Sequence, residues 1–222
     1  MGAFHRRRLP KRPVCLLIRR TVCSLAIVGF LFTGPDARAG LVAVDLVDND
    51  SRGFLTMPTT EGWSFKPNVN VTVTHLGFLD YEGDGLNFSH AVGLWLNGGA
   101  LLGSTTVQTS DPLLDGFRYT SLTPINLLAG QTYVIGAFYS PNSDFLRVVP
   151  FGASSFSTAP EISYLGARYV VGPNSLQRPD VVSTTTGFWG PNFQFTPTVV
   201  PEPGTALFGF ALVGAIVGFR RR

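Results

Sequence analysis

The sequence predicts an all-β fold: an antiparallel β-sandwich of the Greek-key, Ig-like or jelly-roll kind, spanning residues 40–195. Short runs rich in Val, Thr, Phe and Tyr alternate there with the turn-forming residues Gly, Pro, Asn and Asp. No apolar pattern in this region has the 3.6-residue period of a helix. Its length of roughly 160 residues suits one domain with a single core.

Eight segments are expected to form strands, in the order Val42–Asp48, Trp63–Phe65, Val69–Thr74, Val92–Leu96, Ala100–Val107, Gln131–Ser140, Ile162–Val171 and Asn192–Phe195. In the third segment Val69, Val71 and Val73 share one face, but the next apolar residues, Leu76 and Phe78, have the opposite parity. Either a β-bulge near His75 resets the alternation, or the strand is covered on both faces. The segment Gln131–Ser140 is apolar on both faces, which predicts a central strand.

Two short patterns predict local structure. Asn97-Gly98 lies between two of the expected strands and favours a hairpin with a type I′ turn. The spacing from Leu127 to Tyr133 is that of a tyrosine corner, in which the Tyr hydroxyl bonds back to nearby backbone. Tyr133 is therefore expected to have a structural role.

Residues 1–39 are expected to be a secretory signal peptide with a signal helix. A basic segment precedes the apolar run Val22–Phe32, and Ala37-Arg38-Ala39 has the small-x-small pattern of a cleavage site at Ala37 and Ala39. Arg19-Arg20 leaves twin-arginine export open beside the general secretory route. Both cysteines of the chain lie in this leader, so the exported part has no disulfide, thiolate nucleophile or Cys-ligated metal.

The C-terminal residues 201–222 have three parts, preceded by an expected linker at 196–200. The stiff element Pro201-Glu202-Pro203 comes first, then the apolar run Ala206–Phe219, and then Arg220, Arg221 and Arg222. As a helix, this run would be about 21 Å long, short of the ~30 Å hydrocarbon core of a bilayer. We therefore expect a transient transmembrane anchor, oriented by the three arginines at the cytoplasmic face.

This tail resembles the PEP-CTERM sorting signal of Gram-negative, biofilm-forming bacteria. The resemblance implies that the protein is exported, held at the inner membrane as an intermediate, and processed near Pro201-Glu202-Pro203 by an exosortase. It also implies a final place at the cell surface or in the exopolysaccharide matrix, where extracellular polysaccharide is a candidate partner.

Removal of the two ends reverses the net charge. The whole chain has 17 basic and 14 acidic residues, a net charge of +3; residues 40–200 retain six basic and twelve acidic residues, a net charge of −6. Such a balance argues against a nucleic-acid partner.

The region Trp63–Ala137 resembles an extracellular domain of unknown function that is common in PEP-CTERM proteins. The matching pieces are V-T-H-L-G-F-L-D (73–80), G-D-G-L (83–86), S-H-A-V-G-L-W (89–95), G-F-R-Y (116–119), L-A-G-Q-T-Y-V-I-G-A (128–137) and, beyond this region, G-P-N-F-Q-F (190–195). This resemblance implies a β-sandwich in an extracellular setting and no established activity or catalytic residues.

Three groups of side chains are candidate sites. Asp80, Glu82 and Asp84, with Gly83 and Gly85 between them, form either a Ca²⁺-binding loop or a solvated acidic turn. His75 and His90 could form an acid–base pair with Asp80 or Asp84, with Ser89 adjacent, or could be structural. Trp95 and Tyr81 are candidates for a sugar-stacking platform, together with Trp63 and Trp189; Trp95 leaves the face that Val92 and Leu94 bury, so it is either exposed or part of a second buried face.

Three classes of function are compatible with these observations. A non-enzymatic structural or adhesive protein needs only the sorting segments and the fold. A carbohydrate-binding module needs exposed aromatic side chains in a row, and a secreted hydrolase needs a cleft with convergent polar groups. The first class is expected: no enzyme, and no cofactor except a possible Ca²⁺.

Overall fold

The computed structural model describes residues 40–46, 52–149, 156–172 and 174–198, all within the compact unit Arg38–Arg222. The expected signal peptide, with Ala37 and Ala39, and the tail with Pro201–Pro203 and Arg220–Arg222 lie outside these residues. The described residues form strands and no helix, so they contain no helix that could cross a membrane. The strands are β1 (Leu41–Val42), β2 (Val44–Leu46), β3 (Arg52–Gly53), β4 (Thr59–Pro67), β5 (Val71–Leu79), β6 (His90–Leu96), β7 (Leu101–Val107), β8 (Leu113–Leu114), β9 (Phe117–Leu127), β10 (Tyr133–Tyr139), β11 (Leu146–Val149), β12 (Phe156–Thr158), β13 (Ile162–Val171), β14 (Val181–Val182), β15 (Gly187–Trp189) and β16 (Pro191–Pro197).

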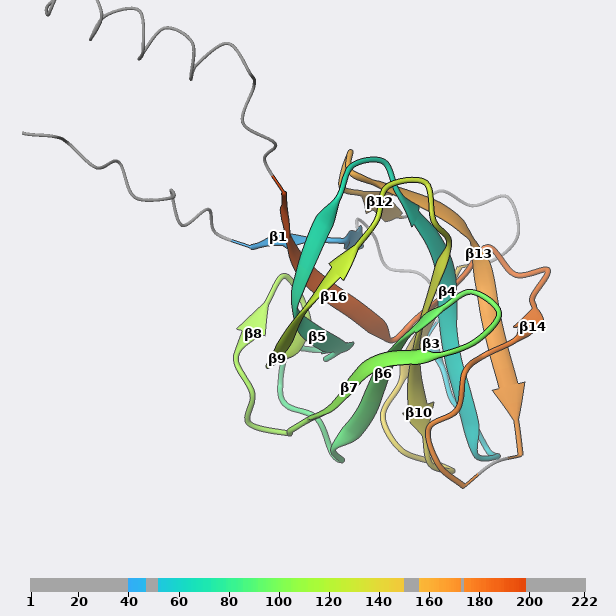
Figure 1. Ribbon diagram of the computed structural model, residues 1–222. Coiled ribbons are helices and arrows are strands. Elements are labelled where there is room, and N and C mark those ends of the chain that lie inside the picture. Colours follow the sequence, from blue (N-terminus) through green and yellow to red (C-terminus); the bar gives the residue numbers. More distant parts are fainter. Residues whose placement is uncertain (1–39, 47–51, 150–155, 173, 199–222) are drawn as a thin grey trace, which may run out of the picture. The chain divides into compact units, whose positions relative to one another are not determined.

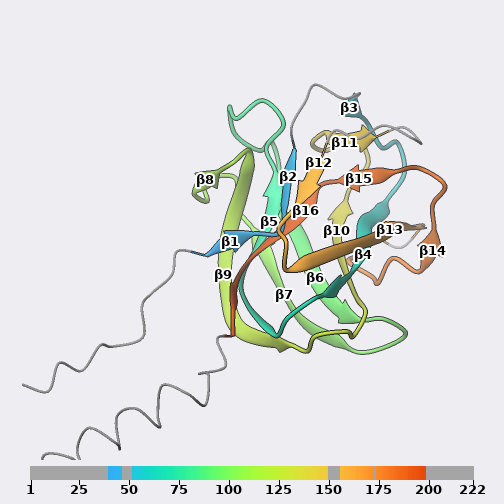
Figure 2. The ribbon, with the colours of Figure 1, turned by 90° about the horizontal axis from the view of Figure 1, so that it is seen from above.

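Two large antiparallel sheets face each other across one apolar core. The five-stranded sheet has the order β1-β16-β5-β9-β8 and lies on the left in Figure 1; the six-stranded sheet has the order β14-β13-β4-β10-β6-β7 and lies on the right. Aromatic rings join the two sheets, because Trp63 and Phe65 of β4 lie 5.7 and 4.8 Å, centroid to centroid, from Phe193 of β16. Two small sheets, β15-β11-β3 and β12-β2, complete the fold (Figure 2).

The centre of the six-stranded sheet is formed by β10 and β4. β10 pairs with β4 on one side and β6 on the other, and every residue of it except Phe138 is buried. The central strand expected at Gln131–Ser140 is therefore confirmed. The expected strand Trp63–Phe65 is only the middle of β4, which begins at Thr59 and ends at Pro67.

Strand β5 contains a bulge and is also covered on both faces at its C-terminal end. Its pairing register with β9 shifts between Val73 and His75, where the parity argument predicted a bulge. Beyond the bulge, Leu76 to Leu79 are all buried, so both of the open alternatives hold. Val69, which was expected to share the face of Val71, precedes the strand and is 43% exposed.

The tyrosine corner is confirmed, and the hairpin is confirmed with a different turn. The hydroxyl of Tyr133 accepts a hydrogen bond of 2.9 Å from the backbone N–H of Leu128. The hairpin joins β6 to β7, but only Gly98 has a positive φ (93°), so the type I′ prediction, which needs a positive φ at Asn97 as well, was wrong. The connection, residues 97–100, is closed by the N–H of Gly99, which donates to the Leu96 carbonyl at 3.1 Å.

The short strands β3, β8, β11, β12, β14 and β15 were not expected, and three longer segments also differ from expectation. The first strand is broken at Ala43 into β1 and β2, which belong to different sheets. The longest strand, β9, was not expected, because its burial is discontinuous and it contains Pro124. Proline fits there because Pro124 lies at the irregularity in the pairing with β5. The last strand ends at Pro197, two residues into the expected linker.

Candidate functional site

Polar side chains gather where two loops meet. One is the loop of residues 80–89 that follows β5, here called the acidic loop, and the other is the loop of residues 140–145 that follows β10. Asp80 is the first residue of the acidic loop, and its side chain is buried, with 3% exposure. Its carboxylate accepts hydrogen bonds of 3.1 Å from the N–H groups of Gly83 and Gly85, and the Nε of Arg118 pairs with it at 2.8 Å. The positive φ angles of Gly83 (74°) and Gly85 (116°) let the loop curl around the carboxylate. Asp80 is thus an internal anchor of its own loop.

The other two carboxylates of the loop point elsewhere. Glu82 pairs with Arg52 of β3 at 3.2 Å, and the Arg52 guanidinium lies 4.8 Å from the ring centroid of Phe145. Asp84 is exposed. Within the described residues, no group of three or more His, Cys, Asp or Glu side chains is arranged to hold a metal ion. The three carboxylates considered for Ca²⁺, those of Asp80, Glu82 and Asp84, therefore do not converge in this structure, and Asp80 already pairs with Arg118 and two backbone amides.

His90 has a different partner from the one expected. Its Nε2 lies 2.8 Å from Oδ2 of Asp144, and its Nδ1 lies 3.0 Å from the carbonyl oxygen of Phe138. Both ring nitrogens therefore face oxygen atoms that can accept a hydrogen bond. The ring also stacks on Phe78, with centroids 3.6 Å apart and planes 7° from parallel.

Asp144 accepts more hydrogen bonds than the pair with His90 alone. The backbone N–H and the side-chain amide of Asn87 donate to it at 2.7 and 2.9 Å, and the N–H of Phe88 donates at 3.0 Å. Burial raises the pKa of Asp144, but the hydrogen bonds from His90, Asn87 and Phe88 outweigh burial, and the net pKa is lower than usual. Asp144 is therefore a buried carboxylate that joins the loop after β10 to the end of the acidic loop and to the first residue of β6.

The acid–base arrangement expected from the sequence is not formed. His90 pairs with neither Asp80 nor Asp84, and the Oγ of Ser89 donates to Gln108 at 3.0 Å. His75 lies on β5, where its Nδ1 is 3.0 Å from the hydroxyl oxygen of Thr74. Of the two alternatives for His90, its burial and its stacking on Phe78 fit the structural one. The sequence did not identify Asp144 as the partner, because it lies 54 residues away.

Known families match the chain in two places. The model of the domain of unknown function DUF4082 matches residues 48–190, and that of the PEP-CTERM protein-sorting motif matches residues 199–222. The chain belongs to the DUF4082 family. The DUF4082 domain is followed by the sorting motif, which implies an exported protein that passes through the membrane and is processed by an exosortase. No curated protein and no solved structure matches the chain.

The tryptophans of the DUF4082 domain offer no stacking platform. Trp63 and Trp189 are fully buried, and Trp95 is 5% exposed. Trp95 lies on the outer face of the sheet, as its parity predicted, but its indole covers Gly93 and belongs to a second buried face. Tyr81 is partly buried, and the centroid of its ring lies 6.2 Å from that of Phe145. The platform expected from Trp95 and Tyr81 is therefore not present as a flat exposed surface.

A cavity of about 70 Å³ lies between the two loops, bordered by Asp80, Asp84 and Asp144.

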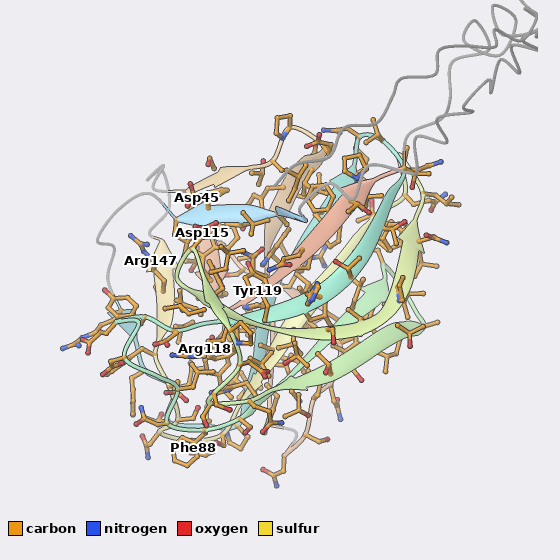
Figure 3. All side chains as sticks on the ribbon, turned by 90° about the vertical axis from the view of Figure 1, so that its left-hand side faces the viewer. Asp45, Phe88, Asp115, Arg118, Tyr119 and Arg147 are labelled. Carbon is orange, nitrogen blue, oxygen red and sulfur yellow. The ribbon has the colours of Figure 1, made fainter. Side chains whose placement is uncertain are left out.

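On the other side of β9, Tyr119 lies near Asp45 and Asp115 (Figure 3). Burial and these two carboxylates hold the pKa of Tyr119 well above its usual range, and its buried hydroxyl has no hydrogen-bond partner among the described residues. Carboxylates are thus concentrated at this end of the DUF4082 domain.

Two further polar residues of the domain escaped the sequence argument. Arg118 is the ion-pair partner of Asp80, and Glu61 is a buried carboxyl on β4. Glu61 has the same parity as Trp63 and Phe65, and this parity could have placed it on the inner face of the sheet. No sequence signal joins Arg118 to Asp80, because 38 residues separate them.

Proposed function

We propose that this chain is a non-enzymatic β-sandwich protein, exported and processed at Pro201-Glu202-Pro203, that serves a structural or adhesive role at the cell surface or in the exopolysaccharide matrix. The sorting motif supports delivery to that place. The observation that carries the adhesive role is the open edge of the six-stranded sheet at β7.

Strand β7 pairs with β6 on one side only and ends the sheet. Its sequence, L-L-G-S-T-T-V, has no charge and no proline, although natural edge strands commonly carry such residues to prevent pairing with another chain. Leu101 is 51% and Leu102 38% exposed. A groove of about 490 Å³ runs beside the strand, between Leu102 of β7 and the partly buried Leu122 and Ile125 of β9.

These features suit association with a second copy of the chain by strand pairing along β7. An added strand would pair with the main chain of β7 ahead of Thr106, whose carbonyl already accepts from Thr120 of β9 at 3.3 Å. Its apolar side chains would fill the groove. Two copies that meet edge to edge in antiparallel fashion satisfy both edges at once. Exported copies would then associate as two-fold dimers without any enzymatic activity.

A charge placed on the edge tests this role. Ser104→Lys introduces a lysine on the exposed side of β7 and should prevent self-association of the exported protein in sedimentation velocity. The matched control is Val182→Lys on β14, the opposite edge of the same sheet, where the side chain is 65% exposed. The proposal fails if the wild type is monomeric at all concentrations reached, or if both variants associate as the wild type does.

A further inference from the structure

A second cavity lies where the inner face of the six-stranded sheet is covered by the small sheet β15-β11-β3. Tyr169 of β13 is opposite Glu61 of β4, and Val171 is opposite Thr59, so these side chains share one face. Phe188 of β15 packs edge-on against Tyr169 with ring centroids 6.3 Å apart. The cavity measures about 250 Å³, and its walls include Phe54, Met57, Glu61, Tyr169, Val171 and Phe188.

Glu61 is the acidic group of this otherwise largely apolar cavity. It is 5% exposed, and its Oε2 has no hydrogen-bond partner among the described residues. Most buried polar atoms in native proteins have a hydrogen-bond partner. The buried Oε2 of Glu61 is therefore a position at which a ligand would supply the missing partner. Burial raises the pKa of Glu61 to about 8, so at neutral pH the free protein holds a neutral acid in the cavity wall.

The rim of the cavity is apolar and open to solvent. Phe54 is 45%, Met57 57% and Val171 43% exposed. Exposed apolar side chains grouped around a cavity with a few polar groups, here Glu61, Tyr169 and two threonines, are the usual composition of a small-molecule site. The excess of acidic over basic residues in the exported part favours a cation over an anion as ligand.

We propose that this cavity binds a small amine, whose apolar body contacts Phe54, Met57 and Phe188 and whose ammonium group pairs with Glu61. On binding, Glu61 releases its proton to solvent, and the carboxylate then accepts hydrogen bonds from the ammonium. No covalent bond forms or breaks. The site lies away from β7 and goes beyond the structural or adhesive role.

Other ionisable groups lie on the strands around Glu61. They are Lys66 on β4 itself, Tyr133 and Tyr139 on β10, Tyr164, Arg168 and Tyr169 on β13, Arg147 on β11 and Arg52 on β3. Glu61 contributes to the raised pKa of Tyr139, after burial. Arg168 donates to Ser64 on the outer face and Arg52 pairs with Glu82. The proton that amine binding displaces is therefore assigned to Glu61.

Three probes with one hexyl chain and different head groups test the site: hexylamine, 1-hexanol and hexanoate. Calorimetric titration of the exported protein should show the tightest binding for hexylamine. Because Glu61 must lose its proton, hexylamine affinity should fall about tenfold for each pH unit below about 8. Proton release, measured in buffers of different ionisation enthalpy, should accompany binding at neutral pH.

Variants separate the roles of the carboxyl and of the cavity. Glu61→Gln should weaken hexylamine binding at least about tenfold at pH 8 and abolish its pH dependence. Glu161→Gln is the matched control, because Glu161 also has a buried oxygen without a partner among the described residues but does not line the cavity. Val171→Trp fills the cavity from its exposed rim and should block hexylamine binding even if Glu61→Gln fails to fold.

Three results would overturn the proposal. The first is no hexylamine binding to the wild type. The second is binding of 1-hexanol or hexanoate as tight as that of hexylamine, which would show that the cavity selects only for the apolar chain or for another head group. The third is hexylamine binding to a folded Glu61→Gln variant with unchanged affinity.

Discussion

The Nε2 atom of His90 lies 2.8 Å from a carboxylate oxygen of Asp144, although 54 residues separate the two in the sequence. His90 begins β6, and Asp144 lies in the loop that leads from β10 to β11. Their side chains are only 1% and 7% exposed. This contact joins the two loops at the end of the domain, because Asp144 also accepts hydrogen bonds from the backbone of Asn87 and Phe88.

Asp144→Asn should destabilise the domain by about 1 to 3 kcal/mol, because its amide group places a donor where a buried carboxylate oxygen now accepts hydrogen bonds from Asn87, Phe88 and His90. Urea unfolding of the exported protein measures this loss. Glu82→Gln is the control, since it breaks a pair with Arg52 whose side chains are 54% and 57% exposed; such pairs contribute less than about 1 kcal/mol. Equal losses in the two variants would contradict a special role for the buried pair.

The same pair gives a defined response to acid. The folded state lowers the pKa of Asp144, so its contribution to stability is present above the unfolded pKa of about 3.9. That contribution is lost as the pH falls through the lower, folded value. Melting curves in this acidic range should show a smaller pH dependence for Asp144→Asn than for the wild type.

Tyr133→Phe should cost about 1 to 3 kcal/mol, because the N–H of Leu128 loses the hydroxyl that accepts its hydrogen bond. Tyr119→Phe is the matched control. The hydroxyl of Tyr119 is buried and has no hydrogen-bond partner among the described residues, so its removal should be neutral or stabilising. An unfolding midpoint of Tyr133→Phe equal to that of the wild type would show that the corner contributes nothing.

Local features of the fold could be predicted from the sequence. The parity change between Val73 and Leu76 located the bulge of β5, and the spacing from Leu127 to Tyr133 located the tyrosine corner. Both depend on neighbours within a few residues, so turn chemistry and strand periodicity contain the information. The central position of β10 followed from apolar side chains on both of its faces.

The candidate sites could not be predicted in the same way. Asp144 reaches His90 only after β6 and β10 have paired, and Arg118 reaches Asp80 only after β5 and β9 have paired. In the folded domain Asp80 and His90 therefore bind these distant partners. Local spacing had suggested the two residues for calcium binding and for acid–base chemistry. Trp95 was expected to be either exposed or buried, and its packing over Gly93 decides for burial. Long-range strand pairing therefore determines which polar groups remain free, and local residue spacing does not reveal that pairing.

Glu61 should make the domain less stable as the pH rises. Its pKa is about 8 in the folded state against an ordinary value of 4.5, so the folded state binds more protons than the unfolded state between these values. Stability should therefore fall from about pH 4.5 to pH 8, by at most about 1.4 kcal/mol per pH unit. In thermal melts across this range, Glu61→Gln should reduce the fall while Glu161→Gln should not; equal slopes in all three proteins would contradict the assignment.

The sorting motif predicts the fate of the exported chain. Replacement of Pro201, Glu202 and Pro203 by alanines removes the stiff polar element at which the exosortase acts, so unprocessed protein should remain with the inner membrane. Cell fractionation followed by intact-mass measurement distinguishes the retained full-length form from the processed one. Thr205→Ala, inside the same motif but outside the Pro-Glu-Pro element, is the control and should be processed as the wild type is. If the triple-alanine variant leaves the membrane with the mass of the processed wild type, the processing signal lies elsewhere in residues 199–222.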